Sequence, residues 1–226
     1  MASEFPRSPS NIKGALVVFE AQLPVPTNLI VFQYNPDEVR RTIGTPAALG
    51  GGAEAAGKPG GGGPQLLLPP PETLQLPIEL DATDQLEFPG QHPITVGTGL
   101  HPTLAALELL LYPPSTMLIL QKALSLAGAS IMRTATAPVV LLVWGPLRVL
   151  PVQVTGIQIH EQAFDQLLNP IRAEATLTLK TLTAFQLAGA PSTIKAMALV
   201  NHVAKEILAR LNGVSAAVQI TVGVSF

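Results

Sequence analysis

The arrangement of apolar and polar residues predicts a protein built mainly from β-strands. The clearest alternation runs from 171 to 179, where odd-numbered positions are apolar and even-numbered positions are polar or charged. This period of two is typical of a strand that buries one face. We therefore expect the odd-numbered side chains to lie in the core, and the even-numbered ones to face a lumen, solvent or a neighbouring subunit.

Further strands are predicted in the N-terminal part of the chain. The β-rich runs 15–19 and 29–32 flank a Pro-Val-Pro-Thr turn at 24–27 and predict a hairpin. The segment 74–80 alternates like 171–179 and predicts another half-buried strand. Within it, Pro77 indicates a sheet edge or a bulge, because proline cannot donate a backbone hydrogen bond.

A second hairpin is predicted from the apolar run 139–144 and the long strand 149–159, which are joined by a Gly-Pro turn. The apolar residues change parity at Gly156, which predicts a β-bulge that returns both sets to the core. Near the end of the chain, 218–224 alternates again and predicts a terminal strand.

Three helices are predicted. The segment 102–111 is apolar nearly all round, with Glu108 as its one marker of a solvent face, so it must be enclosed by the sheet or by a neighbouring subunit. A second short helix is expected at 116–126. The segment 192–211 is amphipathic, and Asn212-Gly213 predicts its end.

These elements suggest an α+β fold, mainly β, with one main domain at 13–188. An N-terminal arm at 1–12 precedes it, and a C-terminal helix with a terminal strand at 189–226 follows it. The domain contains a Gly/Pro-rich insertion at 44–71. We expect its centre, 50–63, to be flexible and dispensable for folding, because glycine-rich sequence buries little apolar surface to offset its ordering entropy.

Composition excludes several function classes. The chain has 226 residues, of which 47% are hydrophobic and 12% are charged, so much of its surface must be uncharged or covered by a partner. It has no cysteine, which excludes disulfides and thiolate chemistry. A net charge of −2 argues against nucleic-acid binding. No apolar run reaches the ~18 residues of a spanning helix, and the first residues do not form a signal peptide, so we expect a cytoplasmic protein without membrane insertion.

Motifs associated with catalysis or cofactors are incomplete. The segment 52–58 has the spacing of a phosphate-binding loop, but Pro59 replaces the magnesium-binding hydroxyl residue and no strand precedes it. His160-Glu161 begins like a zinc-binding helix signature, yet Phe164 occupies the place of the second histidine. We therefore expect no cofactor and no metal.

A carboxylate cluster leaves one enzymatic alternative open. Asp81, Asp84 and Glu87 lie near a predicted strand end, where a turn and a solvated acidic loop explain them most simply. A hydrolase that uses Asp81, Asp84 or Glu161 is the alternative, and it requires a carboxylate pair in one cleft. Trp144 and Phe164 adjoin apolar strands and are interpreted as core aromatics.

Several short segments between about residue 13 and residue 183 together resemble a known family. They are Lys13-Gly14-Ala15-Leu16-Val17-Val18-Phe19, Val31-Phe32-Gln33-Tyr34-Asn35-Pro36, Pro71-Glu72-Thr73-Leu74, Glu79-Leu80-Asp81-Ala82-Thr83-Asp84, Leu104-Ala105-Ala106-Leu107-Glu108, Val143-Trp144-Gly145-Pro146, Phe164-Asp165 and Asn169-Pro170-Ile171-Arg172-Ala173. In this order they are similar to the N-terminal domain of the contractile injection system tube protein family, found in phage-tail-like particles.

The resemblance implies a tail-tube-like antiparallel β-barrel with a flanking short helix, and no enzyme. It implies a six-fold ring of identical subunits at the baseplate end of the inner tube, in contact with the spike or hub protein, the tube protein and other baseplate subunits. Such a protein assembles in the cytoplasm, within a particle that can be released from the cell. Relatives often continue into a peptidoglycan-binding LysM module, which we do not expect here.

Assembly contacts are expected at Arg172, Glu174 and Lys180, on the polar face of the best-predicted strand, and at Glu108. Reversing the charge of Arg172 or Lys180 is expected to weaken assembly without unfolding the chain. A soluble β-barrel that binds a ligand or glycan is the alternative, since it would show the same alternation and low charge.

Overall fold

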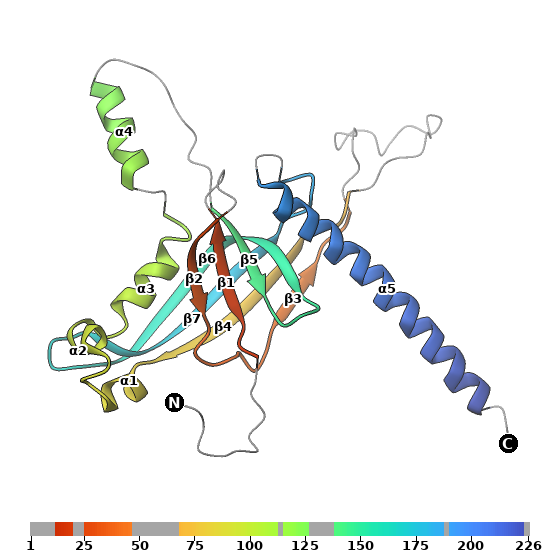
Figure 1. Ribbon diagram of the computed structural model, residues 1–226, viewed down its shortest axis with the longest axis horizontal. Coiled ribbons are helices and arrows are strands. Elements are labelled where there is room, and N and C mark those ends of the chain that lie inside the picture. The colour runs from red at the N-terminus through yellow and green to blue at the C-terminus, as the bar shows by residue number, and fades with distance from the viewer. Residues whose placement is uncertain are drawn as a thin grey trace.

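Seven strands form one antiparallel sheet in a computed structural model that describes residues 12–19, 25–46, 68–112, 115–126, 138–187 and 190–223 (Figure 1). Their order across the sheet is β2-β1-β5-β6-β7-β4-β3. The strands are β1 (Ala15–Phe19), β2 (Pro26–Val31), β3 (Arg40–Ile43), β4 (Glu72–Asp81), β5 (Val139–Val143), β6 (Val149–Phe164) and β7 (Pro170–Thr181). The predicted mainly β class is confirmed.

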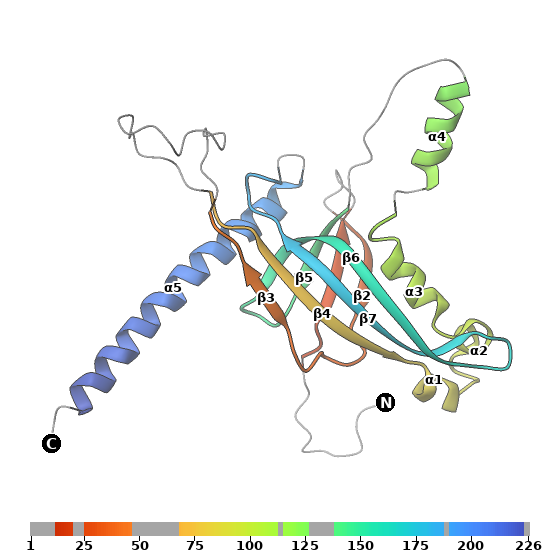
Figure 2. The same ribbon diagram turned by 180° about the vertical axis from the view of Figure 1, so that it is seen from behind.

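The helices lie around this sheet rather than in a layer of their own. They are α1 (Thr83–Glu87), α2 (Pro93–Thr98), α3 (His101–Glu108), α4 (Ser115–Leu126) and α5 (Ser192–Gly223). The first four follow one another between β4 and β5, with α1, α2 and α3 beside the far ends of β6 and β7 and α4 standing apart (Figures 1 and 2). The N-terminal part of the long α5 crosses the sheet, and the rest of the helix extends away from the sheet (Figure 1).

The strands predicted from alternation at 74–80 and 171–179 are confirmed as β4 and β7. In β7 the odd-numbered positions from 173 to 179 are buried, and in β4 the even-numbered positions from 74 to 80 are buried. The pairing of β6 with β7 shifts between Val154 and Gly156, where a bulge was predicted. Pro77 pairs with β7 but lies past Gln75, the last β4 residue paired with β3, so it occupies an open edge as predicted.

One face of the sheet encloses the main core because the sheet is strongly curved. In Figure 1, β2, β1 and β5 pass in front of β6, β7 and β4. Apolar side chains from both halves, such as Leu16, Leu76 and Leu177, belong to one buried cluster and are each 0% exposed. Leu104 and Leu107 of α3 join the same cluster.

A second, smaller core lies on the opposite face of β1 and β5. Leu141 of β5 packs there with Leu187 and with Ile194 in the first turn of α5. This cluster seats the N-terminal end of α5 against the sheet. It explains why an apolar strand such as β5 has buried residues of both parities.

Three predicted boundaries are wrong. The helix predicted at 102–111 ends as α3 at Glu108. The C-terminal helix does not end at Asn212-Gly213 but continues as α5 to Gly223, where the sequence pattern predicted a strand from 218 onward. One glycine costs a helix only about 1 kcal/mol, and alternation produces a strand only where a neighbouring strand can supply hydrogen bonds. The strand predicted at 149–159 also continues to Phe164, because β7 pairs with it as far as Pro170.

Some predictions lie outside the described residues. They concern most of the Gly/Pro-rich insertion, including 50–63, and most of the N-terminal arm. The predicted helix at 116–126 is confirmed as α4, and the first hairpin is confirmed by the antiparallel pairing of β1 with β2. Within the described part of the chain, no helix is both long and apolar enough to cross a membrane.

Candidate assembly surface

The polar face of β4, β7 and β6 carries three of the four predicted interface residues. Arg172 and Glu174 are exposed and Lys180 is half-buried. Across the strands, Lys180 lies opposite Thr73 of β4 and Gln153 of β6. The face is therefore one continuous polar surface, as the alternation predicted.

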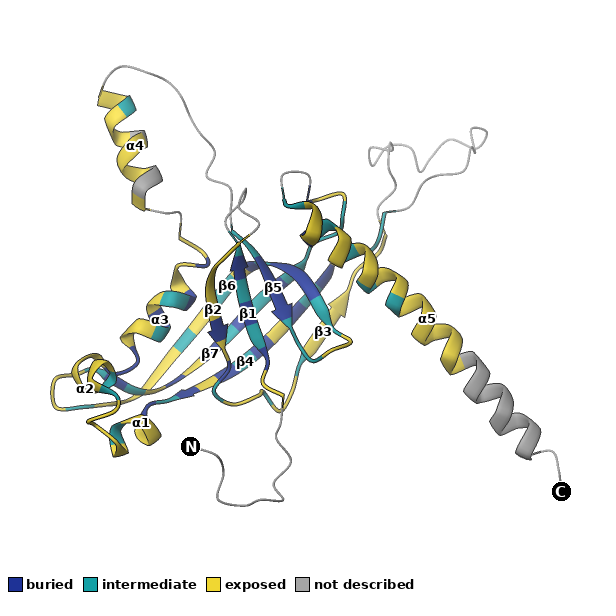
Figure 3. Cartoon of the chain, in the orientation of Figure 1, coloured by how far each residue is buried: buried dark blue, intermediate teal, exposed yellow. Residues whose placement is uncertain are grey.

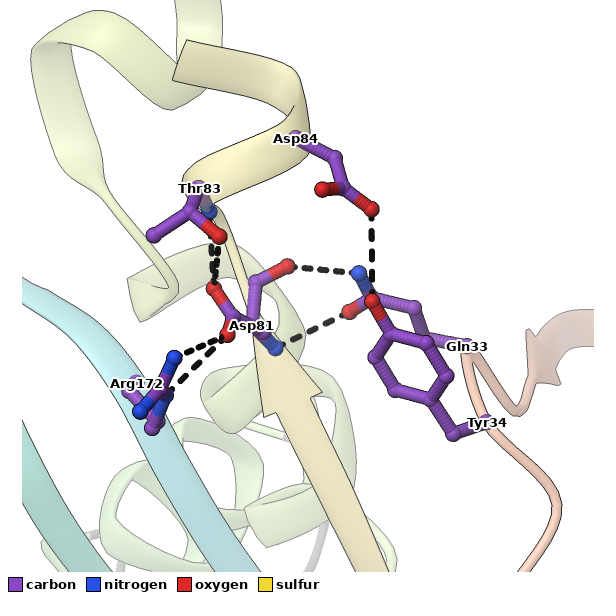
Figure 4. Close-up of polar contacts among 6 residues, drawn as sticks. All are labelled: Gln33, Tyr34, Asp81, Thr83, Asp84 and Arg172. Carbon is purple, nitrogen blue, oxygen red and sulfur yellow. Dashed lines mark hydrogen bonds and ion pairs between the residues drawn. The ribbon is translucent and has the colours of Figure 1, made fainter. Parts of the chain in front are cut away.

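Arg172 is already bonded within its own subunit. Its Nη2 and Nε atoms donate to Asp81 Oδ2 at 2.7 and 3.0 Å (Figure 4). The other carboxylate oxygen, Oδ1, accepts from the Thr83 backbone N–H at 2.8 Å and from its hydroxyl at 2.6 Å. Arg172 thus fastens β7 to the end of β4, where α1 begins.

These donors set the charge state of Asp81. Burial is the largest single influence and raises the pKa of the Asp81 carboxyl, but the hydrogen bonds from Thr83 and Arg172 together outweigh it and hold the pKa below its ordinary value. The carboxylate is therefore ionised and fully engaged. It is a structural group rather than a poised acid or base.

The segment after β2 is tied to the same point of β4. The Gln33 side-chain amide donates to the Asp81 backbone oxygen at 2.6 Å, and the Asp81 backbone N–H donates to Gln33 Oε1 at 2.9 Å (Figure 4). The side chain thus pairs with β4 as a backbone segment would. Sequence reasoning missed this contact, because a glutamine after a strand carries no signal of its distant partner.

Tyr34, beside it, gives Asp84 a structural role. Its hydroxyl donates to Asp84 Oδ2 at 3.2 Å (Figure 4). Desolvation first, and then the Asp84 charge, raise the pKa of the Tyr34 hydroxyl. Asp81 and Asp84 therefore have separate partners rather than forming the carboxylate pair that a hydrolase needs. Among the described residues, no group of three histidine or acidic side chains is arranged to hold a metal ion.

Glu174 occupies a different electrostatic setting. It lies opposite Glu79 of β4 on one side and His160 of β6 on the other. Two like charges directly opposite each other disfavour the sheet. His160, which sequence placed at the end of a strand, is an exposed residue inside β6. The other residue of that candidate motif, Phe164, is 48% exposed, so its prediction as a core aromatic is wrong.

Trp144, by contrast, is a core aromatic as predicted. It is half-buried and packs against the main core. Its ring lies 6.2 Å from that of the buried Phe32, between ring centres. The difference from Phe164 follows from position, since Phe164 ends β6 at the exposed hairpin tip.

The tip between β6 and β7 is a tight turn with apolar side chains in solvent. Asp165 Oδ1 accepts from the backbone N–H groups of Leu167 and Asn169, each at 2.8 Å. The hydrogen bonds from Asn169, chiefly from its side chain, lower the pKa of Asp165. Leu167 and Leu168 are 76% and 77% exposed, and Leu168 has a positive φ of 64°. The polar turn therefore presents two leucines outward.

Glu108, the fourth predicted residue, lies at the exposed end of α3. The predicted enclosure of this helix is found on one side only: Leu104, Leu107 and, after the helix, Leu110 are buried, while the other residues that follow it are exposed. Leu109 is 59% and Tyr112 is 64% exposed. The described side chains of the adjoining α4 are also largely exposed, as the yellow parts of its ribbon in Figure 3 show.

The other extensive apolar surface lies on α5, which a buried ion pair holds to the sheet. Glu72 of β4, whose side chain is 7% exposed, accepts from Lys205 Nζ at 2.7 Å and lies 3.5 Å from Arg41 Nε. No sequence signal marks this contact. The apolar stripe of α5 remains uncovered (Figure 3) and comprises Val200, Val203, Ile207 and Leu211, which are 43% to 66% exposed.

A surface cavity of about 600 Å³ lies between the end of β2 and the α1–α3 segment. Its lining mixes polar side chains, such as Gln33, Gln85 and His92, with apolar ones, such as Leu100. A cavity with such a mixed lining is the feature that a ligand-binding protein, the alternative predicted from the sequence, would require.

Comparison with known proteins found no family model that matches this chain and no significant match among curated proteins. The resemblance to the tube protein family stays a prediction.

Proposed function

We propose that this protein is a structural subunit of a contractile injection system, and that it forms a ring at the baseplate end of the inner tube, between the spike or hub protein and the tube. The curved sheet is then each subunit's share of a tail-tube-like β-barrel. Other baseplate subunits contact its outer surface. The protein carries out no reaction and needs no cofactor.

The observation that carries this proposal is the amount of apolar surface left uncovered on a charge-poor chain. Exposed leucine, isoleucine and valine side chains occur on α4, on α5 and on the edge strand β2, where Leu29 is 58% and Val31 is 52% exposed. Patches of this kind mark surfaces that a partner covers. In the described part of the chain, β2 and β3 are the two edge strands of the sheet, and a ring could pair such edges with a neighbouring subunit.

The contacts of the acidic side chains also support a structural role rather than a hydrolase. Asp81 and Asp84 are engaged in hydrogen bonds within the chain, which removes the main reason to propose a hydrolase. Of the predicted interface residues, Lys180, Glu174 and Glu108 have side chains that make no hydrogen bond or ion pair with other described residues.

Mass photometry of the purified protein, at low and high concentration, tests the proposal. We expect a discrete oligomer of ring mass in equilibrium with smaller species, and ring-shaped particles by electron microscopy. A protein that stays monomeric at all concentrations and is monomeric in isolated particles would refute it.

The cavity beside α1–α3 supports a second candidate, a ligand- or glycan-binding module. In that case a monomeric protein should bind a member of a glycan panel in calorimetry, and His92→Ala, which alters the cavity lining, should weaken binding. Exposed Leu147→Ala, on the turn between β5 and β6, is the matched control.

A further inference from the structure

Two unpartnered surfaces of this chain lie on opposite sides of the sheet. The first is the α5 stripe (Val200, Val203, Ile207 and Leu211). The second, which we call the α3 exit patch, comprises Glu108, Leu109, Leu111 and Tyr112. Figures 1 and 2 place α5 and α3 on opposite sides of the strands in both views. One copy therefore cannot cover one surface with the other.

The α5 stripe faces away from the sheet. The helix contacts its own subunit through Ile194 and Lys205, which are separated by three turns. At 3.6 residues per turn, Val203 and Ile207 lie on nearly the opposite side of the helix from this pair. From Glu206 to Asn212 every described side chain is exposed. A helix in this position needs a partner outside the subunit, because isolated helical turns are only marginally stable in water.

The two surfaces have opposite charge. Residues 82–112, which contain α1, α2 and the α3 exit patch, have three acidic residues and neither lysine nor arginine. Residues 192–212 of α5 have three basic residues and one acidic residue, but Lys205 is bonded to Glu72 on the opposite side of the helix, so Arg210 supplies the positive charge next to the α5 stripe. Arg210 is exposed beside the α5 stripe, and Glu108 is exposed within the α3 exit patch. Apolar surfaces with opposite charges suit each other, whereas two copies of α5 would bring like charges together.

We propose that the α5 stripe of one copy packs against the α3 exit patch of the next copy. This inference rests on the proposed ring and names the contact that builds it. Because the two surfaces differ and lie on opposite sides, the contact is head-to-tail, and its repetition closes a ring when the rotation between copies permits.

Cysteine cross-linking tests the contact without background, because the chain contains no cysteine. Leu109 and Ile207 are 59% and 53% exposed, so Leu109→Cys and Ile207→Cys should leave the fold intact, which thermal melts check. A short bismaleimide should link the double variant into a ladder of covalent oligomers up to ring mass. The two single variants mixed should form only a covalent dimer, and each alone should stay unlinked.

The control replaces Leu109→Cys with Leu147→Cys, which is more accessible, at 72% exposed, but lies on the turn between β5 and β6. Combined with Ile207→Cys it should give no ladder. Efficient dimerisation of Ile207→Cys alone would overturn the proposal in favour of α5 pairing with α5. Rings in the unmodified protein together with no ladder above the control would overturn it while the proposed function stands, whereas a monomeric unmodified protein would refute both.

Charge reversal gives an independent readout. Arg210→Glu and Glu108→Arg should each weaken association by up to about five-fold, because an exposed ion pair contributes at most about 1 kcal/mol. Both reversals in one chain should restore it. Failure of the double variant to recover would contradict a direct contact between these two surfaces.

Discussion

At the scale of single residues, side chains that look catalytic in the sequence hold the fold together. Asp81 joins β4, β7 and the start of α1, and Gln33 adds the segment after β2 to the same point. Gly99 shows the same principle for the backbone. Its φ is +56°, and a Cβ there would overlap the carbonyl oxygen of Pro170. That oxygen also accepts from the Leu100 N–H at 2.8 Å, so the turn before α3 lies directly on β7.

Asp81→Asn should lower the free energy of unfolding by about 1 kcal/mol at pH 7, because the carboxylate accepts four hydrogen bonds but its partner Arg172 is half exposed. The folded-state pKa lies below the ordinary 3.8, so this contribution is complete above about pH 4 and is lost as the pH falls through the folded-state pKa. Urea melts across pH 2 to 7 should show the difference between wild type and variant shrinking at low pH.

The control for that change is Glu79→Gln, an exposed carboxylate on the same strand. It should stay within about 0.5 kcal/mol of wild type. A difference for Asp81→Asn that does not vary with pH would contradict the assigned role of its charge.

Gly99→Ala should destabilise the protein by about 1–3 kcal/mol, because alanine is strained at positive φ and its Cβ meets the Pro170 carbonyl. Gly97→Ala, two residues earlier in α2, meets nothing within 4 Å and should be neutral or stabilising by about 0.4–1 kcal/mol. Thermal melts of the pair compare the two. Equal effects would show that the close packing of the turn on β7 is not formed in solution.

At the scale of elements, α5 shows how a long helix is held by few contacts. Ile194 seats its first turn in the small core, and the Glu72–Lys205 ion pair fixes it three turns later. Between them the helix crosses the sheet, and beyond them its described side chains are exposed. The position of α5 therefore depends on the small core at its first turn and on the buried Glu72 carboxylate three turns later.

Lys205→Met should lower the free energy of unfolding by about 1–3 kcal/mol, because the buried Glu72 carboxylate then keeps only the more distant Arg41 as its cationic partner. Hydrogen exchange should increase at 192–205 before it changes in the strands. Adding Glu72→Gln should recover part of the loss, since no unpaired charge then remains buried. Arg210→Met, an exposed cation on the same helix, is the control, and an equal effect there would contradict the anchoring role.

At the scale of the whole molecule, many large apolar side chains stay exposed after folding. On the polar face of the sheet, only some of the charged side chains are bonded within the subunit. Arg172 is bonded to Asp81, whereas Lys180 lies between uncharged neighbours, Thr73 and Gln153. The two cations on β7 should therefore respond differently to mutation.

Lys180→Glu should leave the monomer within about 0.5 kcal/mol of wild type in urea melts and should weaken ring formation in mass photometry. Arg172→Glu, unlike Lys180→Glu, should lower the free energy of unfolding of the monomer, by about 1–3 kcal/mol, in addition to weakening ring formation. It places a second carboxylate beside Asp81 and removes two hydrogen bonds. Thr176→Ala on the same face should affect neither property. Unchanged assembly in Lys180→Glu would exclude this residue from the interface.

The local pattern of the sequence determined most strands by itself. Burial in β4 and β7 and the bulge at Gly156 follow from the order of apolar and polar residues, because side chains alternate between the two faces of any strand. The edge position of Pro77 follows from its missing backbone N–H. The low charge likewise predicted that much of the surface is uncharged. The three predicted interface residues on β7, Arg172, Glu174 and Lys180, lie on its polar face, which the same alternation explains, whereas Glu108 lies at the exposed end of helix α3.

Only the tertiary structure decided which segments meet. The strand order, the pairing of Gln33 with Asp81 across 48 positions and that of Lys205 with Glu72 across 133 positions depend on the curvature of the whole sheet. The end of α5 was also decided by the tertiary structure, because a segment with alternating residues becomes a strand only beside an available strand. Local patterns specify which side of an element is apolar, whereas long-range contacts specify what that side touches.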